Sequence, residues 1–217
     1  MFCGIVDWSA TGDMLQGWGS ILGALAIMVA AYFGSQTFKA WRQQNLSERK
    51  VKQAERILTA TYIARRELGR VRSPAMWSNE TDRAEEKLVE AGELVAGQAR
   101  SDDDRRLITA QAYYNRLNEA ADVRRELEEC LPMARALFGS EVEQALEAMN
   151  HHFWSVKVYV DANHRDRSGA DKEFRRKIDS TIWTGYPSKE ENEIDLAVEK
   201  NVALIEEKCL PALRLEA

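Results

Sequence analysis

An uncharged stretch near the start of the chain is its clearest hydrophobic pattern. It runs from Met14 to Phe38 without an Asp, Glu, Lys or Arg, and its middle is almost wholly apolar. A helix needs roughly 20 apolar residues to cross about 30 Å of hydrocarbon, where it must satisfy its own backbone groups. The pattern predicts a transmembrane helix over residues 14–38, with a buried core helix as the alternative.

The ends of this stretch carry residues that suit the two surfaces of a membrane. Trp18 and Trp41 are separated by roughly 35 Å along a helix axis. Tryptophan and long cationic side chains are enriched where hydrocarbon meets water. We therefore expect Trp18, Trp41, Lys39 and Arg42 to lie at the membrane interface.

Small residues recur along one side of the predicted transmembrane helix. Their spacings of four, three, four and four place these residues on one face: Gly19, Gly23, Ala26, Ala30 and Gly34. Such a face lets two helices approach closely, which predicts a homo-oligomer. Ordinary membrane-helix composition is the alternative, because Gly and Ala are common in these segments.

The charges on the two sides of the stretch predict its orientation. Residues 1–38 carry two acids only, whereas residues 39–72 carry ten Lys or Arg against three Glu. Basic flanks stay on the cytoplasmic side, so we expect the N-terminus outside, the C-terminus in the cytoplasm and, in a bacterium, the inner membrane. No basic segment precedes the stretch, so we expect no signal-peptide cleavage.

The remaining charge bears on the partners of the chain. The formal net charge is −5 in total, although residues 39–72 alone have a net charge of +7. This basic segment should be attracted to anionic lipid headgroups, so the lipid bilayer is the first expected partner. The rest of the chain is acidic and repels phosphate at long range, so we do not expect nucleic acid as a partner.

Apolar residues after the membrane segment repeat at helical spacing, which predicts an all-α protein. We expect an extracytoplasmic tail over residues 1–13, the membrane helix over 14–38, a basic juxtamembrane helix over 39–72 and a cytosolic α-helical domain over 73–217. One face of the juxtamembrane helix should pack on another helix, and its members are Ala54, Ile57, Thr61, Ala64, Leu68 and Val71.

Breaks and capping residues divide the last segment into further predicted helices. They cover residues 81–100, 101–139 with a bend or stop near Pro132, and about 170–183. Capping boxes at Ser140–Glu143 and Ser188–Glu191 start two more. The clearest amphipathic stripe follows the first box: Val142, Leu146, Met149, Phe153, Val156 and Val160. The last helix repeats the pattern with Ile194, Val198, Val202, Ile205 and Cys209.

The three cysteines do not form a disulfide framework. Cys130 and Cys209 each precede a Leu-Pro pair, and we expect both to be reduced and buried on a helix face. A functional pair is the alternative. Cys3 has no partner on its side of the membrane.

No motif in the chain has the spacing that a known catalytic or cofactor site requires. His164-Arg165-Asp166 matches the start of a kinase catalytic loop, but the other kinase motifs are missing. The three histidines lack metalloprotease or di-iron spacing, so we expect no metal and no cofactor. One basic cluster is a candidate for anion docking, with a solvated helix face as the alternative: Arg165, Arg167, Lys172, Arg175, Arg176 and Lys177.

These patterns favour a membrane-anchored interaction or sensor protein whose cytosolic bundle binds an unknown protein partner. An oligomerising effector that perturbs the bilayer is the first alternative, because the small-residue face would support assembly. An enzyme acting on nucleic acid or a phosphorylated ligand is the second. The chain carries no motif specific enough to name a family.

Overall fold

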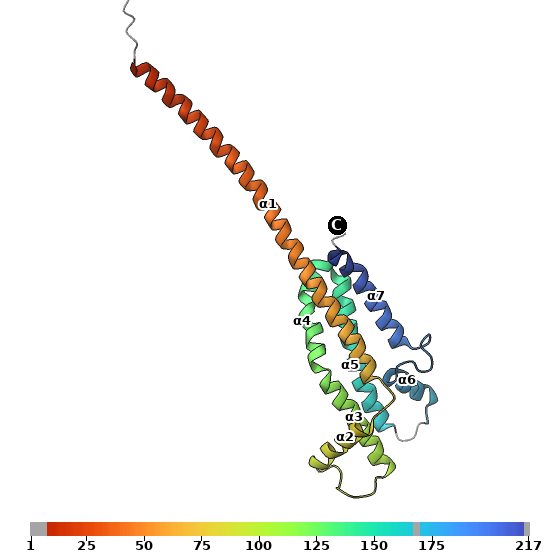
Figure 1. The fold of residues 1–217 in the computed structure, drawn as a ribbon. Helices are drawn as coiled ribbons and strands as arrows, with labels where there is room; N and C mark the ends of the chain where they lie inside the picture. Colours follow the sequence, from red (N-terminus) through yellow and green to blue (C-terminus); the bar gives the residue numbers. More distant parts are fainter. Residues whose placement is uncertain (1–7, 167–169, 215–217) are drawn as a thin grey trace, which may run out of the picture. The chain divides into compact units, whose positions relative to one another are not determined.

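The computed structural model describes residues 8–166 and 170–214, with side chains from Leu22 onward except those of Ala24 and Ala26. All of its regular elements in these ranges are α-helices, which confirms that the protein is all-α (Figure 1). The seven described helices are α1 (Trp8–Val71), α2 (Ser78–Glu90), α3 (Asp102–Glu119), α4 (Ala121–Phe138), α5 (Ser140–Arg165), α6 (Lys172–Ile182) and α7 (Glu193–Leu213). Cys3 and Arg167 lie outside the described residues.

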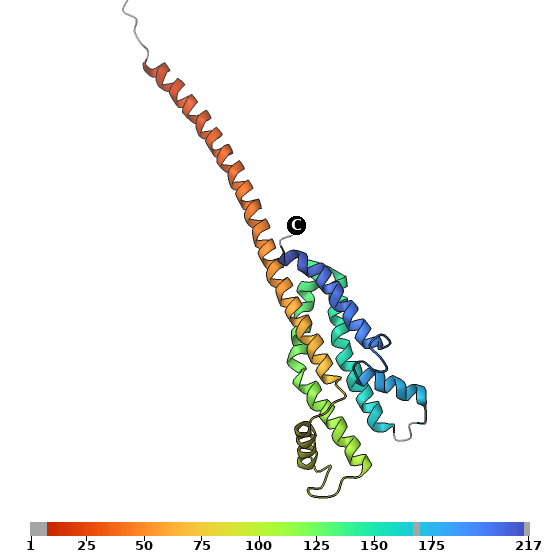
Figure 2. The ribbon, with the colours of Figure 1, turned by 45° about the vertical axis from the view of Figure 1, so that its right-hand side comes forward.

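The chain divides into two units, and α1 contributes to both of them. The first unit covers residues 1–49 and the second covers residues 50–217. The part of the predicted juxtamembrane helix from Lys50 onward therefore belongs to the helical bundle. In Figures 1 and 2, α4, α5 and α7 lie alongside this part of α1.

The predicted packing face of α1 is buried in the core of the bundle. Its six members are at most 2% exposed: Ala54, Ile57, Thr61, Ala64, Leu68 and Val71. Polar contacts along its margins tie α1 to neighbouring helices. Arg56 binds Glu126 of α4 at 2.6 Å, and Tyr62 donates to Glu206 of α7 at 2.8 Å. Helices of the same chain thus cover this face.

Helix α5 is at the centre of the bundle and packs against α3, α4, α6 and α7. Its predicted apolar stripe is confirmed, because each of its six members is at most 1% exposed. Phe153 is among the largest fully buried side chains. The helix begins at Ser140, but Gly139 occupies the cap position and Ser140 does not cap the helix, so the predicted capping box is wrong.

The predicted helix over residues 81–100 is shorter than expected. Helix α2 ends at Glu90, and the chain reaches α3 through a loop in which Gly92 and Gly97 have φ angles of +76° and +73°. This left-handed conformation favours glycine and ends a right-handed helix. A small second core joins α2 to α3: Ala84, Leu88, Leu94, Ile108 and Ala112.

The predicted break at Pro132 is instead found twelve residues earlier. Helix α3 is capped by Ser101, whose hydroxyl accepts from the Asp104 amide at 3.1 Å, and it ends at Glu119. Pro132 lies inside α4. A proline removes one helical hydrogen bond. The buried side chains of Leu127, Cys130 and Ala134 keep α4 in the core on both sides of Pro132.

Helix α7 also starts later than predicted. Its cap is Asn192, whose side chain accepts from the Asp195 amide at 3.0 Å, so the capping box at Ser188–Glu191 is wrong. The apolar stripe is confirmed from Val198 onward, and Ile194 is partly buried. Cys130 and Cys209 are free and buried, as expected. Burial raises the pKa of the Cys209 thiol to about 12.

Candidate functional site

Large apolar side chains are exposed on every side of α1 in its first unit. Ten of them are between 48% and 71% exposed: Leu22, Leu25, Ile27, Met28, Val29, Tyr32, Phe33, Phe38, Trp41 and Leu46. Ile27, Met28 and Val29 are consecutive, and successive helical residues point about 100° apart. The exposed apolar surface therefore surrounds the helix instead of forming one stripe.

Within the described part of the chain, no helix is both long and apolar enough to cross a membrane. The side chains of residues 14–21, Ala24 and Ala26 fall outside that part. These include Trp18, Gly19 and Ala26 of the predicted interface and packing sites. The transmembrane helix over residues 14–38 stays a prediction.

The described members of the predicted membrane sites are all exposed on α1. A methyl group added at Gly23 or Gly34 would meet nothing within 4 Å, and Ala30 is exposed. The Trp41 ring stacks on Phe38 with ring centres 5.8 Å apart. The small-residue face is thus open to a neighbouring helix, and its role in packing stays a prediction.

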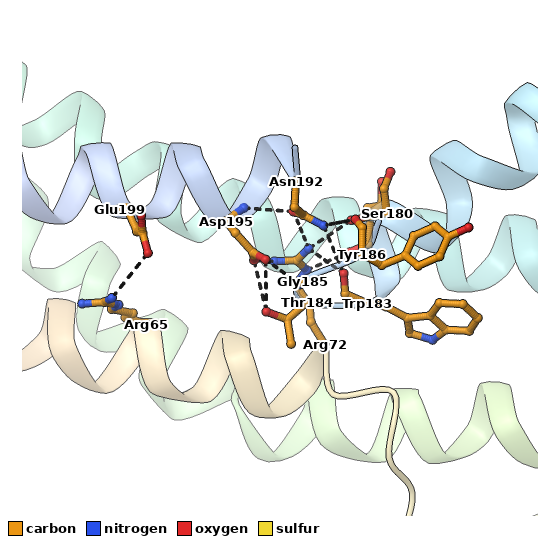
Figure 3. Close-up of polar contacts among 11 residues, drawn as sticks. Arg65, Arg72, Ser180, Trp183, Thr184, Gly185, Tyr186, Asn192, Asp195 and Glu199 are labelled. Carbon is orange, nitrogen blue, oxygen red and sulfur yellow. Dashed lines mark hydrogen bonds and ion pairs between the residues drawn. The ribbon is translucent and has the colours of Figure 1, made fainter. Parts of the chain in front are cut away.

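A buried arginine directly after α1 organises contacts between α1, α6 and α7 within the bundle. Arg72 is 1% exposed and forms an ion pair with Asp195 (Figure 3). Its guanidinium also donates to the side-chain oxygen of Asn192 at 2.9 Å. Further donations, at 2.8–3.1 Å, reach the backbone carbonyls of Ser180, Thr181 and Trp183.

Helix ends explain why this position suits a cation. The three carbonyls lie at the C-terminal end of α6, where the helix dipole is negative. Burial lowers the pKa of the Arg72 guanidinium, while the charge of Asp195 and its hydrogen bond oppose that shift. Asp195 also accepts from the Gly185 amide at 2.6 Å. Arg72 thereby joins α1, α6 and α7 at one point.

A second buried arginine holds the segment that follows Arg72. Arg116 of α3 donates to the carbonyls of Ser73 and Ala75 at 2.8 and 2.6 Å. It also binds Glu80 at 2.7 Å, and this hydrogen bond is the main reason that the pKa of Glu80 is lowered. Arg72 thus holds the start of the connection between α1 and α2, and Arg116 holds the residues that follow it and the first turn of α2.

His152 on α5 has a partly buried side chain that this network influences. Its Nε2 atom is buried and has no hydrogen-bond partner among the described residues. Burial lowers the pKa of His152 to about 4, and the charges of Arg72 and His151 act in the same direction. The folded bundle thus favours the neutral imidazole.

The free energy of unfolding should therefore decrease as the pH falls from about 6.5 to 4. An unfolded His152 takes up its proton near pH 6.5, whereas the folded side chain stays neutral until about pH 4. Between these values the unfolded state binds more protons, with a slope of at most about 1.4 kcal/mol per pH unit. Urea unfolding at several pH values measures this slope. A His152→Gln variant should show a shallower slope, because only the contribution of His152 is removed, and an unchanged slope in that variant would contradict the assignment.

The predicted anion-docking cluster is largely paired with carboxylates. Arg176 lies 3.3 Å from Glu191, and Lys177 forms an ion pair with Glu193. Arg175 donates to Asn163 at 2.7 Å and lies 3.4 Å from Asp179. Arg165 ends α5 and Lys172 begins α6. An anion would have to compete with these partners, and anion docking remains a prediction.

Arg72 and Arg116 are the site residues that sequence reasoning missed. Arg72 lies directly between the last residue of α1 and the Ser-Pro pair that follows it, and Arg116 is the one charged residue among the buried residues of α3. Arginine is almost never fully buried unless it is paired, so an arginine on an apolar helix face indicates a buried ion pair. Their partners are more than 30 residues away in the sequence, so spacing does not identify them.

The arrangement around Arg72 is suited to holding helices together. All five side-chain hydrogen bonds of Arg72 engage partners on the α6–α7 connection or in the adjoining ends of these two helices (Figure 3). In the described ranges, no group of three or more His, Cys, Asp or Glu residues is placed to hold a metal ion.

Comparisons with protein-family models, curated proteins and solved structures give no match to this chain.

Proposed function

We propose that the protein is anchored by a single membrane-spanning helix and that its helical bundle binds a protein partner in the cytoplasm. The observation that carries the anchor is the apolar surface that surrounds α1 around Ile27, Met28 and Val29. Extended exposed apolar surfaces mark sites that contact a membrane or another protein. A helix that is apolar all round is suited to burial on every side.

A bilayer fits this surface better than a protein groove does. A groove covers one face of a helix, so the opposite face would keep its polar residues. Here three consecutive residues are each more than half exposed, and the uncharged run extends from Met14 to Phe38. Lipid covers all sides of a helix at once.

The bundle has a self-contained core. The packing face of α1 from Ala54 to Val71 is covered by the same chain, so residues 50–217 form a unit with its own interior. Arg72 and Arg116 fix the helix connections of this unit. We infer a rigid binding module on the cytoplasmic side, which the basic residues after Phe38 favour.

A Val29→Arg variant of the full chain should lose its stable membrane insertion. Arginine near the centre of a span costs about 2.5–3.5 kcal/mol. After alkaline carbonate extraction, the wild-type protein should stay in the membrane pellet and the variant should appear in the supernatant. Leu46→Arg is the matched control, because Leu46 is equally exposed on α1 (56% against 54%) but lies beyond the span. Extraction of the wild-type protein by carbonate would refute the anchor.

A further inference from the structure

Cations that follow the apolar stretch differ from those of the bundle in their pairing. Lys39, Arg42, Arg49 and Lys52 are exposed, and none forms an ion pair with another described residue. Arg56, four residues further on, binds Glu126 at 2.6 Å and Glu129 at 2.7 Å. The charges of these four cations are therefore available to an external anion.

Aromatic side chains accompany the first two of these cations. Trp41 lies between Lys39 and Arg42 in the sequence, is 58% exposed and stacks on Phe38. Exposed tryptophan next to lysine and arginine is typical of the level at which lipid headgroups lie. The acidic residue nearest to these two cations in the sequence is Glu48, and it accepts a hydrogen bond from Gln44 at 3.2 Å.

Distances along the helix separate the cations into two groups. The headgroup layer on each side of the hydrocarbon is roughly 5–8 Å thick. At 1.5 Å per residue, Arg42 lies about 6 Å beyond Phe38, whereas Arg49 lies about 16 Å beyond it. Only Lys39 and Arg42 therefore fall within the headgroup layer if Phe38 ends the span.

We propose that Lys39, Trp41 and Arg42 form a binding surface for anionic phospholipid headgroups, an inference that rests on the proposed membrane anchor. The two side chains supply positive charge and N–H donors to a headgroup phosphate, and the Trp41 ring contacts the upper acyl chain. Arg49 and Lys52 are too far along the helix to share this surface, and Arg56 is occupied by its two glutamates.

The test measures lipid preference with the full chain reconstituted in phosphatidylcholine vesicles. Trace spin-labelled phosphatidylglycerol or phosphatidylcholine reports the fraction of each lipid that the protein immobilises. The wild-type protein should prefer phosphatidylglycerol. A Lys39→Gln/Arg42→Gln variant should lower this preference by about fivefold or more, since each cation near the surface contributes a factor of that order.

An Arg49→Gln/Lys52→Gln variant is the matched control, because it removes the same charge from exposed sites on the same helix. It should keep the wild-type preference. Equal losses in both variants would refute a local surface, and so would a wild-type preference near one. Carbonate extraction of the same vesicles tests the anchor separately: an inserted protein without lipid preference leaves the proposed function intact, whereas a protein that does not insert refutes both.

Discussion

Replacing Arg72 with methionine should destabilise the bundle by about 3–5 kcal/mol, because it leaves a partly buried carboxylate without its cation. Asp195 would lose its ion pair, and Asn192 would lose a donor at 2.9 Å. The Thr181 carbonyl at the end of α6 would lose its bond as well. Urea unfolding of a fragment over residues 50–217, followed by circular dichroism, measures the loss.

Arg70→Met is the matched control for this experiment. Arg70 lies two residues away on α1 and pairs with Glu67 and Glu119, each at 2.8 Å, but its side chain is 37% exposed. Exposed ion pairs contribute about 0–1 kcal/mol, so this variant should change the free energy of unfolding by less than about 1 kcal/mol. Equal losses for the two arginines would show that the Arg72 network is not a special support of the fold.

Truncating Phe153 to alanine should cost about 3–5 kcal/mol, because it removes a fully buried ring from the central helix. Trp154 is the adjacent control, since its side chain is 53% exposed. Trp154→Ala should change the free energy of unfolding by under about 1 kcal/mol. The same urea titration measures both variants. A Phe153→Ala loss below about 1 kcal/mol would place the apolar stripe of α5 on the wrong side.

Residue spacing predicted the interior of the bundle more accurately than its helix ends. The stripe from Val142 to Val160 and the face from Ala54 to Val71 are buried as expected. Apolar periodicity reports directly which side of a helix avoids water. Periodicity does not show whether the helix that covers such a side belongs to the same chain. For the face from Ala54 to Val71, the covering helices belong to the same chain.

Helix ends depend on contacts that local sequence does not contain. Pro132 carries the strongest local signal for a break, yet α4 continues through it because Leu127 and Ala134 are held in the core. The cap of α7 is Asn192, whose side chain also donates to the Ser180 and Tyr186 carbonyls. Those partners are set by the position of α6 and its following turn, which Arg72 holds from a distant part of the chain.

The long separation between Arg72 and Asp195 has a consequence for the order of events during synthesis. The two residues are 123 positions apart. At roughly 5–20 residues per second, the ribosome needs at least about 6 s to make Asp195 after Arg72. During that interval Arg72, directly after α1, does not yet have Asp195 as its carboxylate partner. The apolar residues before Lys39 have already been made by then. Translation therefore presents the apolar stretch to its surroundings before the bundle is able to close.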